Sequence, residues 1–288
     1  MVRAFPWHTM MMAVLVVLAG WLFAAADLPA EAAGLEQGWV AGANSRARLN
    51  FCPPEPDRAS QPLRPLAFLE LQLDDGWKTY WRMPGDAGVA PAFDWSGSAN
   101  VASATTLYPA PHRMGDQGGE AIGYKSAVIF PVRLELREAA LVATPKVIFS
   151  YGICKNICVP VDLTLEAACY GASAATAAAV DAVPRTPGHS RPGDPILVAV
   201  SGSVAGAQPR LTVDVDYGVG AEDADLFIEA PEGLYVPLPA RSAPDATGRA
   251  RYIIDLSKII DARDLGGKQL RLTMTSARGA SEAVWAAR

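Results

Sequence analysis

The feature that most constrains the fold of this 288-residue chain is an alternation of apolar and polar residues with a period of two. The segments LAFLELQL (66–73), AVIFPVRLEL (127–136), VIFSYGI (147–153) and VPVDLTLEAAC (159–169) each place their larger apolar residues on one side of an extended strand. Such alternation is typical of strands with one buried face. Many short strands separated by Gly, Pro and Asp turns predict an all-β protein made of β-sandwiches.

One segment interrupts this pattern. Residues 172–194, ASAATAAAVDAVPRTPGHSRPGD, begin Ala-rich and become rich in Pro and Gly. We predict a short helix followed by a semi-rigid linker, with one β-sandwich domain over residues 35–171 and a second over 195–288. The alternation resumes beyond the linker in PILVAV, RLTVDVDYG, DLFIEA, ARYIIDL, QLRLTMT and EAVWAA.

The N-terminus predicts export from the cytosol. A single basic residue, Arg3, precedes the apolar run MMMAVLVVLAGWLF, which ends in the small residues AAAD. This order is that of a secretory signal peptide, here residues 1–26 with Ala24 and Ala26 at the cleavage positions, and the run is shorter than a membrane span. The formal net charge of −5 argues against nucleic acid as a partner. We therefore expect a soluble protein in a compartment where disulfides persist.

Two of the four cysteines, Cys154 and Cys158, lie close together in YGICKNICVP. Counting by two from the apolar positions, both project away from the core and flank a turn made by Lys155, Asn156 and Ile157. We expect both to be accessible to solvent. A disulfide across so short a loop adds little stability, whereas a nearby lysine favours the reactive thiolate. The pattern therefore indicates a redox role more than a structural one.

The remaining cysteines, Cys52 and Cys169, lie near the two ends of the first set of strands. An even cysteine count in an exported domain favours pairing, so we regard them as a structural disulfide candidate. The period of two places Cys169 on the buried face of its strand and Cys52 on the polar side of its own.

Several segments carry a resemblance to a known family: DGWKTYWRMPGDAG, FDWSGSANV, YPAPHRM, GGEAIGYKSAVIFPV and YGICKNICVPVDLTL. In this order they resemble the N-terminal periplasmic domain of the thiol:disulfide interchange protein DsbD, and most of all its ScsB-like branch. The resemblance implies immunoglobulin-like sandwiches in the periplasm and thiol–disulfide exchange without a cofactor. It also implies a membrane-embedded thiol electron donor and periplasmic thioredoxin-like or disulfide-containing protein partners.

Carried over residue by residue, the resemblance makes Cys154 and Cys158 the redox pair, with Tyr80 and Trp81 as modulating aromatic residues near it. Lys155 is a modulating residue by its charge, because it lies between the two cysteines. It identifies the segment from Met114 to Glu120 as a cap loop that shields the pair, comprising Met114, Gly115, Asp116, Gln117, Gly118, Gly119 and Glu120. Two features depart from the family pattern. The pair is spaced more closely than in the best-known members, and MGDQGGE has no aromatic residue, so shielding here should be weaker or come from other residues.

Two other functions stay open at this stage. His112, Met114 and Met83 could join the cysteines in a Cu(I) site, since soft thiolate and thioether ligands suit that ion. Alternatively, the chain is a non-catalytic interaction module in which the cysteines only staple a hairpin. We expect no resident metal. Because residues 195–288 contain no cysteine, the second domain should position the first or widen its docking surface.

Overall fold

The computed structural model describes residues 38–53, 65–85, 88–116, 119–138, 140–259 and 262–288. The expected signal peptide, residues 1–26, lies outside the described residues. Gly38–Arg288 form one compact unit. Among the described residues, no helix is long and apolar enough to cross a membrane.

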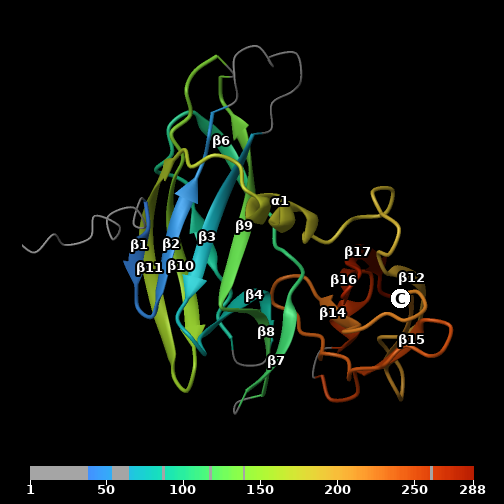
Figure 1. The fold of residues 1–288 in the computed structure, drawn as a ribbon. Helices are drawn as coiled ribbons and strands as arrows, with labels where there is room; N and C mark the ends of the chain where they lie inside the picture. The colour runs from blue at the N-terminus through green and yellow to red at the C-terminus, as the bar shows by residue number, and fades with distance from the viewer. Residues whose placement is uncertain (1–37, 54–64, 86–87, 117–118, 139, 260–261) are drawn as a thin grey trace, which may run out of the picture. The chain divides into compact units, whose positions relative to one another are not determined.

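The first part of this unit is the expected β-sandwich (Figure 1). Its strands are β1 (Val40–Gly42), β2 (Ser45–Asn50), β3 (Leu66–Leu73), β4 (Lys78–Gly85), β5 (Ala92–Asp94), β6 (Val101–Thr106), β7 (His112–Asp116), β8 (Gly119–Lys125), β9 (Ala127–Leu136), β10 (Lys146–Cys154) and β11 (Cys158–Ala168). Hydrogen bonds connect them in the order β6-β9-β3-β2-β11-β10-β4-β8-β7, with β1 beside β2 and β5 beside β10. Strand β11 pairs with β10 along its length and with β2 only at its far end, so it links the two layers.

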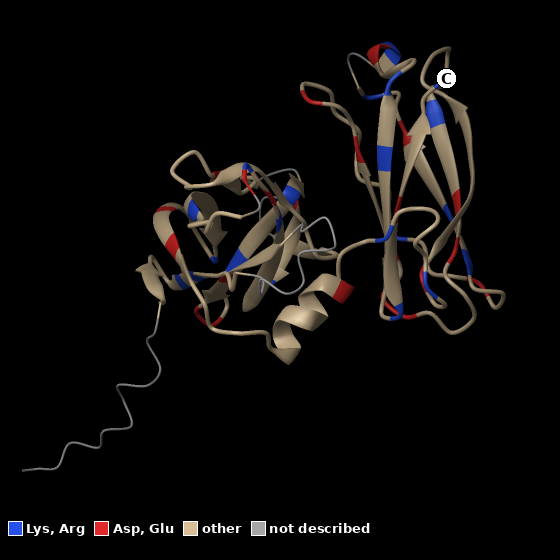
Figure 2. Cartoon of the chain, turned by 90° about the horizontal axis from the view of Figure 1, so that it is seen from above, with Lys and Arg blue, Asp and Glu red and all other residues tan. Residues whose placement is uncertain are grey.

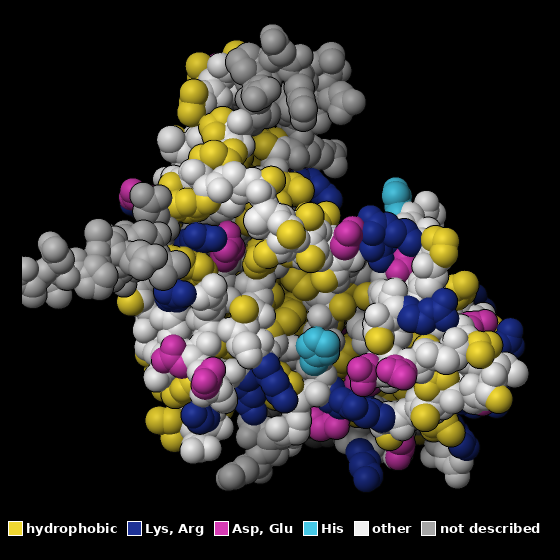
Figure 3. Space-filling model, viewed as in Figure 1, with side chains coloured by type: hydrophobic (Ala, Val, Ile, Leu, Met, Phe, Trp, Pro, Cys, Tyr) yellow, Lys and Arg dark blue, Asp and Glu magenta, His cyan; other side chains and the backbone are white. Residues whose placement is uncertain are grey.

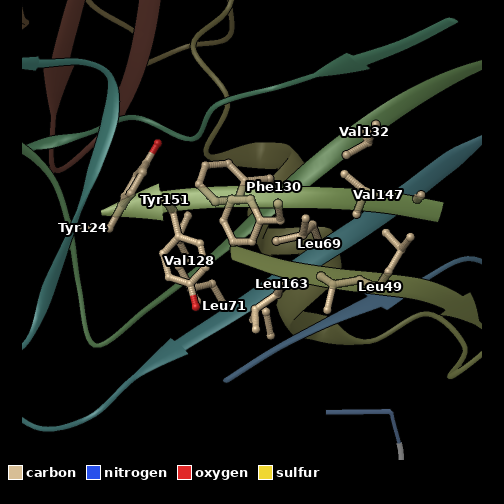
Figure 4. Close-up of a cluster of buried hydrophobic side chains, with 14 of the residues drawn as sticks. Leu49, Leu69, Leu71, Tyr124, Val128, Phe130, Val132, Val147, Tyr151 and Leu163 are labelled. Carbon is tan, nitrogen blue, oxygen red and sulfur yellow. The ribbon is translucent and has the colours of Figure 1, made fainter. Parts of the chain in front are cut away.

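The interior of this sandwich is lined by the apolar faces predicted from the period of two. Leu69, Leu71, Phe130, Phe149 and Leu165 are all at most 1% exposed. Figure 4 shows residues of β2, β3, β9, β10 and β11 converging on this core. The aromatic rings pack directly, with the Phe93 and Phe149 centroids 5.1 Å apart. The all-β, immunoglobulin-like fold class is confirmed.

The C-terminal part contains two three-stranded sheets, ordered β12-β13-β15 and β14-β16-β17. The strands are β12 (Ile196–Ser203), β13 (Arg210–Asp216), β14 (Asp225–Glu229), β15 (Arg249–Asp255), β16 (Gln269–Ser276) and β17 (Gly279–Ala286), with a short 3-10 helix, η3 (Ala262–Leu265). Each strand coincides with one of the alternating segments of the sequence. Between the sheets lies a second core that includes Val213, Tyr252 and Leu272.

Strand β14 contributes to both cores. Leu226 and Ile228 lie in the second core. Phe227, between them, is fully buried among the residues of the first core, and its ring lies 5.8 Å from that of Trp81. Because neighbouring residues of a strand point to opposite faces, one strand can serve two cores in this way.

The predicted helix and linker join the two parts. Helix α1 (Ala174–Asp181) begins at Ser173, whose side chain accepts a hydrogen bond from the Thr176 amide in a capping box. Beyond it the linker is held in place, since Arg185 forms an ion pair of 2.8 Å with Asp194 and a β-bridge with Ser281 of β17. Asp194 is 8% exposed, which places this ion pair at the margin of the interior.

Charged residues of both signs are interspersed along the strands and loops of the chain (Figure 2). On the face drawn in Figure 3 they lie among exposed apolar side chains without separating into large areas of one sign. The distribution agrees with the small formal net charge of −5.

Candidate functional site

The close cysteine pair is at the tip of the β10–β11 hairpin. Cys154 ends β10, Cys158 begins β11, and the two residues are directly paired across the predicted turn of Lys155, Asn156 and Ile157. They form a disulfide with a Cα–Cα distance of 4.2 Å. Two antiparallel strands joined by three residues bring the sulfurs together without further constraint from the fold.

The two cysteine residues differ in exposure. Cys158 is exposed, whereas Cys154 is only 4% exposed and clusters with Tyr80, Met114 and Ala121. The prediction that both cysteines are accessible is therefore wrong for Cys154. The period of two correctly placed Cys154 on the face away from the main core, but a second layer of side chains covers that face.

This cover comes from strands β4, β7 and β8. Tyr80 projects from β4, Met114 from β7 and Ala121 from β8, and each is at most 2% exposed. In Figure 1 these strands lie at the end of the first sandwich to which the β10–β11 hairpin points. The Tyr80 hydroxyl lies 3.4 Å from Cys158 Sγ, within hydrogen-bonding distance for sulfur.

The segment expected to be a cap loop is largely a β-hairpin. Met114–Asp116 belong to β7, and Gly119 and Glu120 belong to β8. Gln117 and Gly118 lie outside the described residues. Within the described segment Met114 covers Cys154, and the aromatic ring at the site is Tyr80 of β4.

The two aromatic residues assigned by resemblance have different environments. Tyr80 lies against the pair, but Trp81 points to the other face of β4, where it is fully buried in the main core beside Phe227. Adjacent residues of a strand must face opposite sides. The structure therefore brings Tyr80, and not Trp81, to the cysteines.

Two lysines, Lys155 and Lys78, lie at the tip of the hairpin. Lys155 extends over the turn between β3 and β4, where its Nζ donates to the Asp75 carbonyl oxygen over 3.0 Å. Gly76 makes this approach feasible: its φ is +82°, and a Cβ there would lie 2.9 Å from Lys155 Cε. Lys78 of β4 is directly opposite Cys154 in the sheet. Sequence reasoning missed Lys78, because nothing in the sequence shows that β4 pairs with β10.

A buried arginine holds the covering hairpin from its other side. Arg113, next to Met114 on β7, forms a two-pronged ion pair with Asp225 of β14, at 2.9 and 2.8 Å, and a further bond to Glu120 at 2.6 Å. The Arg113 and Asp225 side chains are 3% and 7% exposed. Burial lowers the pKa of Arg113, but the hydrogen bonds and charges of Asp225 and Glu120 outweigh it and raise that pKa above its usual value.

A second arginine makes a similar connection. Arg82 of β4 binds both carboxylate oxygens of Glu229, each at 2.8 Å, and also bonds to Glu282. Burial lowers the pKa of Arg82, yet the two glutamates raise it overall. Both arginines therefore stay charged, and together they tie the strands around the cysteine pair to β14 and β17.

The structure also joins Cys52 and Cys169 in a disulfide, with a Cα–Cα distance of 4.6 Å and a sequence separation of 117. Cys169 is exposed, so its predicted place on a buried face is wrong: β11 ends at Ala168, and the alternation stops there. The two disulfides lie at opposite ends of the eleven residues of β11, about 35 Å apart along an extended strand.

The residues considered for copper are dispersed. Met114 lies against Cys154, but Met83 packs against the main core and His112 is exposed at the start of β7. Among the described residues, no three His, Cys, Asp or Glu side chains are grouped as a metal site would require.

The fold and the site together define an immunoglobulin-like, all-β protein with a half-covered disulfide at the tip of a hairpin. Residues 53–168 match the family model described as "Thiol:disulfide interchange protein DsbD, N-terminal". Over these residues the first sandwich is similar to the DsbD N-terminal family.

A solved structure, the N-terminal periplasmic domain of ScsB from Proteus mirabilis, is similar to this chain with a TM-score of 0.62 and 23% sequence identity. The match covers 87% of this chain and 97% of the solved one, so the shared fold extends over both sandwiches. No curated protein matches the chain.

Proposed function

We propose that this protein is a periplasmic thiol–disulfide exchange module that relays reducing equivalents through Cys154 and Cys158. The observation that carries the proposal is the unequal exposure of one disulfide: Cys158 is open to a partner while Cys154 is 4% exposed. A disulfide that only staples a hairpin has no need of such a difference. The family match over residues 53–168 supports the same chemistry.

In the proposed cycle, a donor thiolate attacks Cys158 Sγ, which forms a mixed disulfide and releases Cys154 as a thiolate. The donor's second thiol then attacks the donor sulfur of that mixed disulfide, leaving the donor oxidised and the pair as two thiols. In the second half, Cys158 attacks a disulfide of the acceptor, and Cys154 attacks Cys158 Sγ to restore the pair. Two electrons and two protons pass from donor to acceptor, and no cofactor is needed.

The partners that fit this cycle are a membrane-embedded thiol donor and periplasmic thioredoxin-like or disulfide-containing acceptors. Two observations support this location and partnership: the family that the first sandwich matches and the periplasmic origin named for the similar ScsB domain. The signal-like sequence of residues 1–26 supports export. The second sandwich, which holds the covering strands through Arg82 and Arg113, is proposed to set the position of the cover.

The reduction potential of the Cys154–Cys158 pair tests the proposal. Equilibration with glutathione buffers, read by mass spectrometry, should give a potential less reducing than about −300 mV, above the range of structural disulfides. The Cys52–Cys169 disulfide in the same sample is the internal control and should remain oxidised. A Cys154–Cys158 potential as low as that of the control would refute the exchange function.

A further inference from the structure

A cavity lined by lysines lies beside the redox pair. It has a volume of about 740 Å³, and its described lining residues include Lys78, Lys125 and Lys155. These lysines come from three separate parts of the chain: β4, the end of β8 and the turn between β10 and β11. Gly115, next to Met114 in the cover, forms part of the wall.

Sheet pairing fixes how the lysines lie relative to the sulfurs. Cys158 is opposite Cys154, Cys154 is opposite Lys78, and Lys78 is opposite Lys125. Directly paired residues of antiparallel strands project from the same face and are about 5 Å apart. The two cysteines and two lysines therefore form one row across four strands, in which the backbone positions of Lys78 and Lys125 lie about 5 and 10 Å from that of Cys154.

Two members of the group are open to solvent. Lys125 and Lys155 are exposed, and the bond described above from Lys155 is to a neutral backbone carbonyl. An incoming molecule that places an acidic group one or two residues from its own disulfide would bring opposite charges within a few ångströms. At such distances near a protein surface, each charge pair stabilises the encounter appreciably.

We propose that this lysine cavity is a substrate-binding site that selects disulfides bearing carboxylates next to the sulfur atoms. Its natural occupant is an acidic segment flanking the reactive disulfide of a protein partner. The inference rests on the proposed exchange function, because it concerns which disulfides the Cys154–Cys158 pair meets. It adds charge selectivity as a property of this site.

The reaction used to test it is balanced without an added reductant. Starting from the dithiol protein, Cys158 attacks one sulfur of a small disulfide and expels the first thiolate. Cys154 then attacks Cys158 Sγ and expels the second. The protein loses two electrons and forms its Cys154–Cys158 disulfide, while the small disulfide becomes two thiols.

Three small disulfides of different charge serve as probes: oxidised glutathione, which is anionic, hydroxyethyl disulfide, which is neutral, and cystamine, which is cationic. The rate of protein oxidation is measured with each at low ionic strength. We expect oxidised glutathione to react faster than cystamine after each rate is divided by that of the same disulfide with free cysteine. The preference should shrink at 1 M salt, where the Debye length is about 3 Å.

Variants then locate the preference. Lys125→Gln and Lys155→Gln should each reduce the glutathione-to-cystamine rate ratio about threefold, and the double variant should remove most of it. Lys268→Gln is the matched control, because it removes the same charge from an exposed lysine just before β16. A change in thiol pKa would alter all three rates together and leave the ratio unchanged.

The outcomes separate the two proposals. If none of the three disulfides oxidises the pair, the exchange function itself fails. If the neutral disulfide reacts but the anionic and cationic probes do not differ, the exchange function stands and the charge-selective site is refuted. An equal loss of the ratio in Lys268→Gln would attribute the preference to overall charge and would also refute the site.

Discussion

At the scale of single residues, burial distinguishes two chemically identical cysteines. Cys158 is exposed and within 3.4 Å of the Tyr80 hydroxyl, whereas Cys154 is covered by Met114 and Ala121. Thiol–disulfide exchange requires a nearly linear approach to the attacked sulfur, so access decides which sulfur meets the partner. The exposed sulfur should form the mixed disulfide, and the buried sulfur should resolve it.

Replacing one cysteine at a time tests this division of tasks. With Cys154→Ala, Cys158 is expected to remain covalently attached to an acceptor, since no second thiol is present to release it. With Cys158→Ala, Cys154 should react at least tenfold more slowly with the same acceptor because Met114 and Tyr80 block it. Non-reducing electrophoresis with mass spectrometry of the adduct measures both. Efficient trapping only by the Cys158→Ala protein would reverse the assignment.

At the scale of elements, the β7–β8 hairpin is held on both faces. Met114 packs against Cys154 on one face, and the adjacent Arg113 binds Asp225 on the other. Any movement that exposes Cys154 by displacing β7 must strain or break a buried, two-pronged ion pair. The stability of that pair therefore influences how often the buried sulfur becomes accessible.

Weakening this ion pair should make Cys154 more reactive. Asp225→Asn keeps the shape of the side chain but removes the charge that Arg113 requires, and loss of one partner of a buried pair can cost about 3–5 kcal/mol. In a Cys158→Ser background, the alkylation rate of Cys154 should rise severalfold. Hydrogen exchange of the Met114 and Ala121 amides should rise with it.

Glu120→Gln is the comparison for this experiment, because Glu120 also binds Arg113 but its side chain is 46% exposed. An exposed ion pair contributes about 1 kcal/mol or less, so this variant should behave almost as the parent does. Unchanged Cys154 reactivity in a folded Asp225→Asn protein would mean that the cover moves independently of β14.

At the scale of the whole molecule, the two disulfides constrain the chain very differently. The Cys52–Cys169 bridge spans 117 residues and encloses most of the first sandwich, whereas Cys154–Cys158 spans 4. The entropy lost by the unfolded chain grows with the length of the closed loop. The long bridge should therefore stabilise the fold, and the short one should be free to open and close during exchange.

Removing each disulfide measures this difference. On the chain-entropy model, replacing Cys52 and Cys169 by Ser should lower the free energy of unfolding by about 5 kcal/mol. The corresponding change at Cys154 and Cys158 should lower it by about 2 kcal/mol. Urea unfolding of both double variants against the oxidised parent gives the two values. Equal losses, or free thiols at Cys52 and Cys169 in the parent, would contradict the structural role of the long bridge.

The two sandwiches also share buried surface through β14. Phe227 belongs to β14 but is fully buried in the first core, so Phe227→Ala should lower the free energy of unfolding by about 3–5 kcal/mol.

A chain ending at Gly171 is expected to fold and to exchange its pair with a small disulfide. Its melting temperature should be lower than that of the full chain, because Trp81, Arg82 and Arg113 lose their partners.

Differential scanning calorimetry and the exchange rate of the shortened chain test both statements. Leu226→Ala in the full chain is the companion to Phe227→Ala, because Leu226 lies in the second core and its loss should leave the contacts of the first core in place. An unfolded shortened chain, or a pair that no longer exchanges, would mean that the two sandwiches are one cooperative unit and that the boundary at residues 172–194 is misplaced.

The sequence by itself determined the local structure. The period of two identified strands such as β9 and β10, and it placed Phe130 and Phe149 on the buried face, because a strand with one buried face must alternate. The Ala-rich segment predicted α1, and the spacing of Cys154 and Cys158 predicted the hairpin that joins them. Each of these depends on residues close together in the chain.

Only the tertiary structure decided what surrounds the site. The alternation shows that Cys154 points away from one core, but it does not show that Tyr80 and Met114 cover the opposite face. Lys78 beside Cys154 and Asp225 beside Arg113 are pairings between residues 76 and 112 positions apart. Such contacts arise from the packing of strands distant in the chain, and a period of two carries no information about which strands become neighbours.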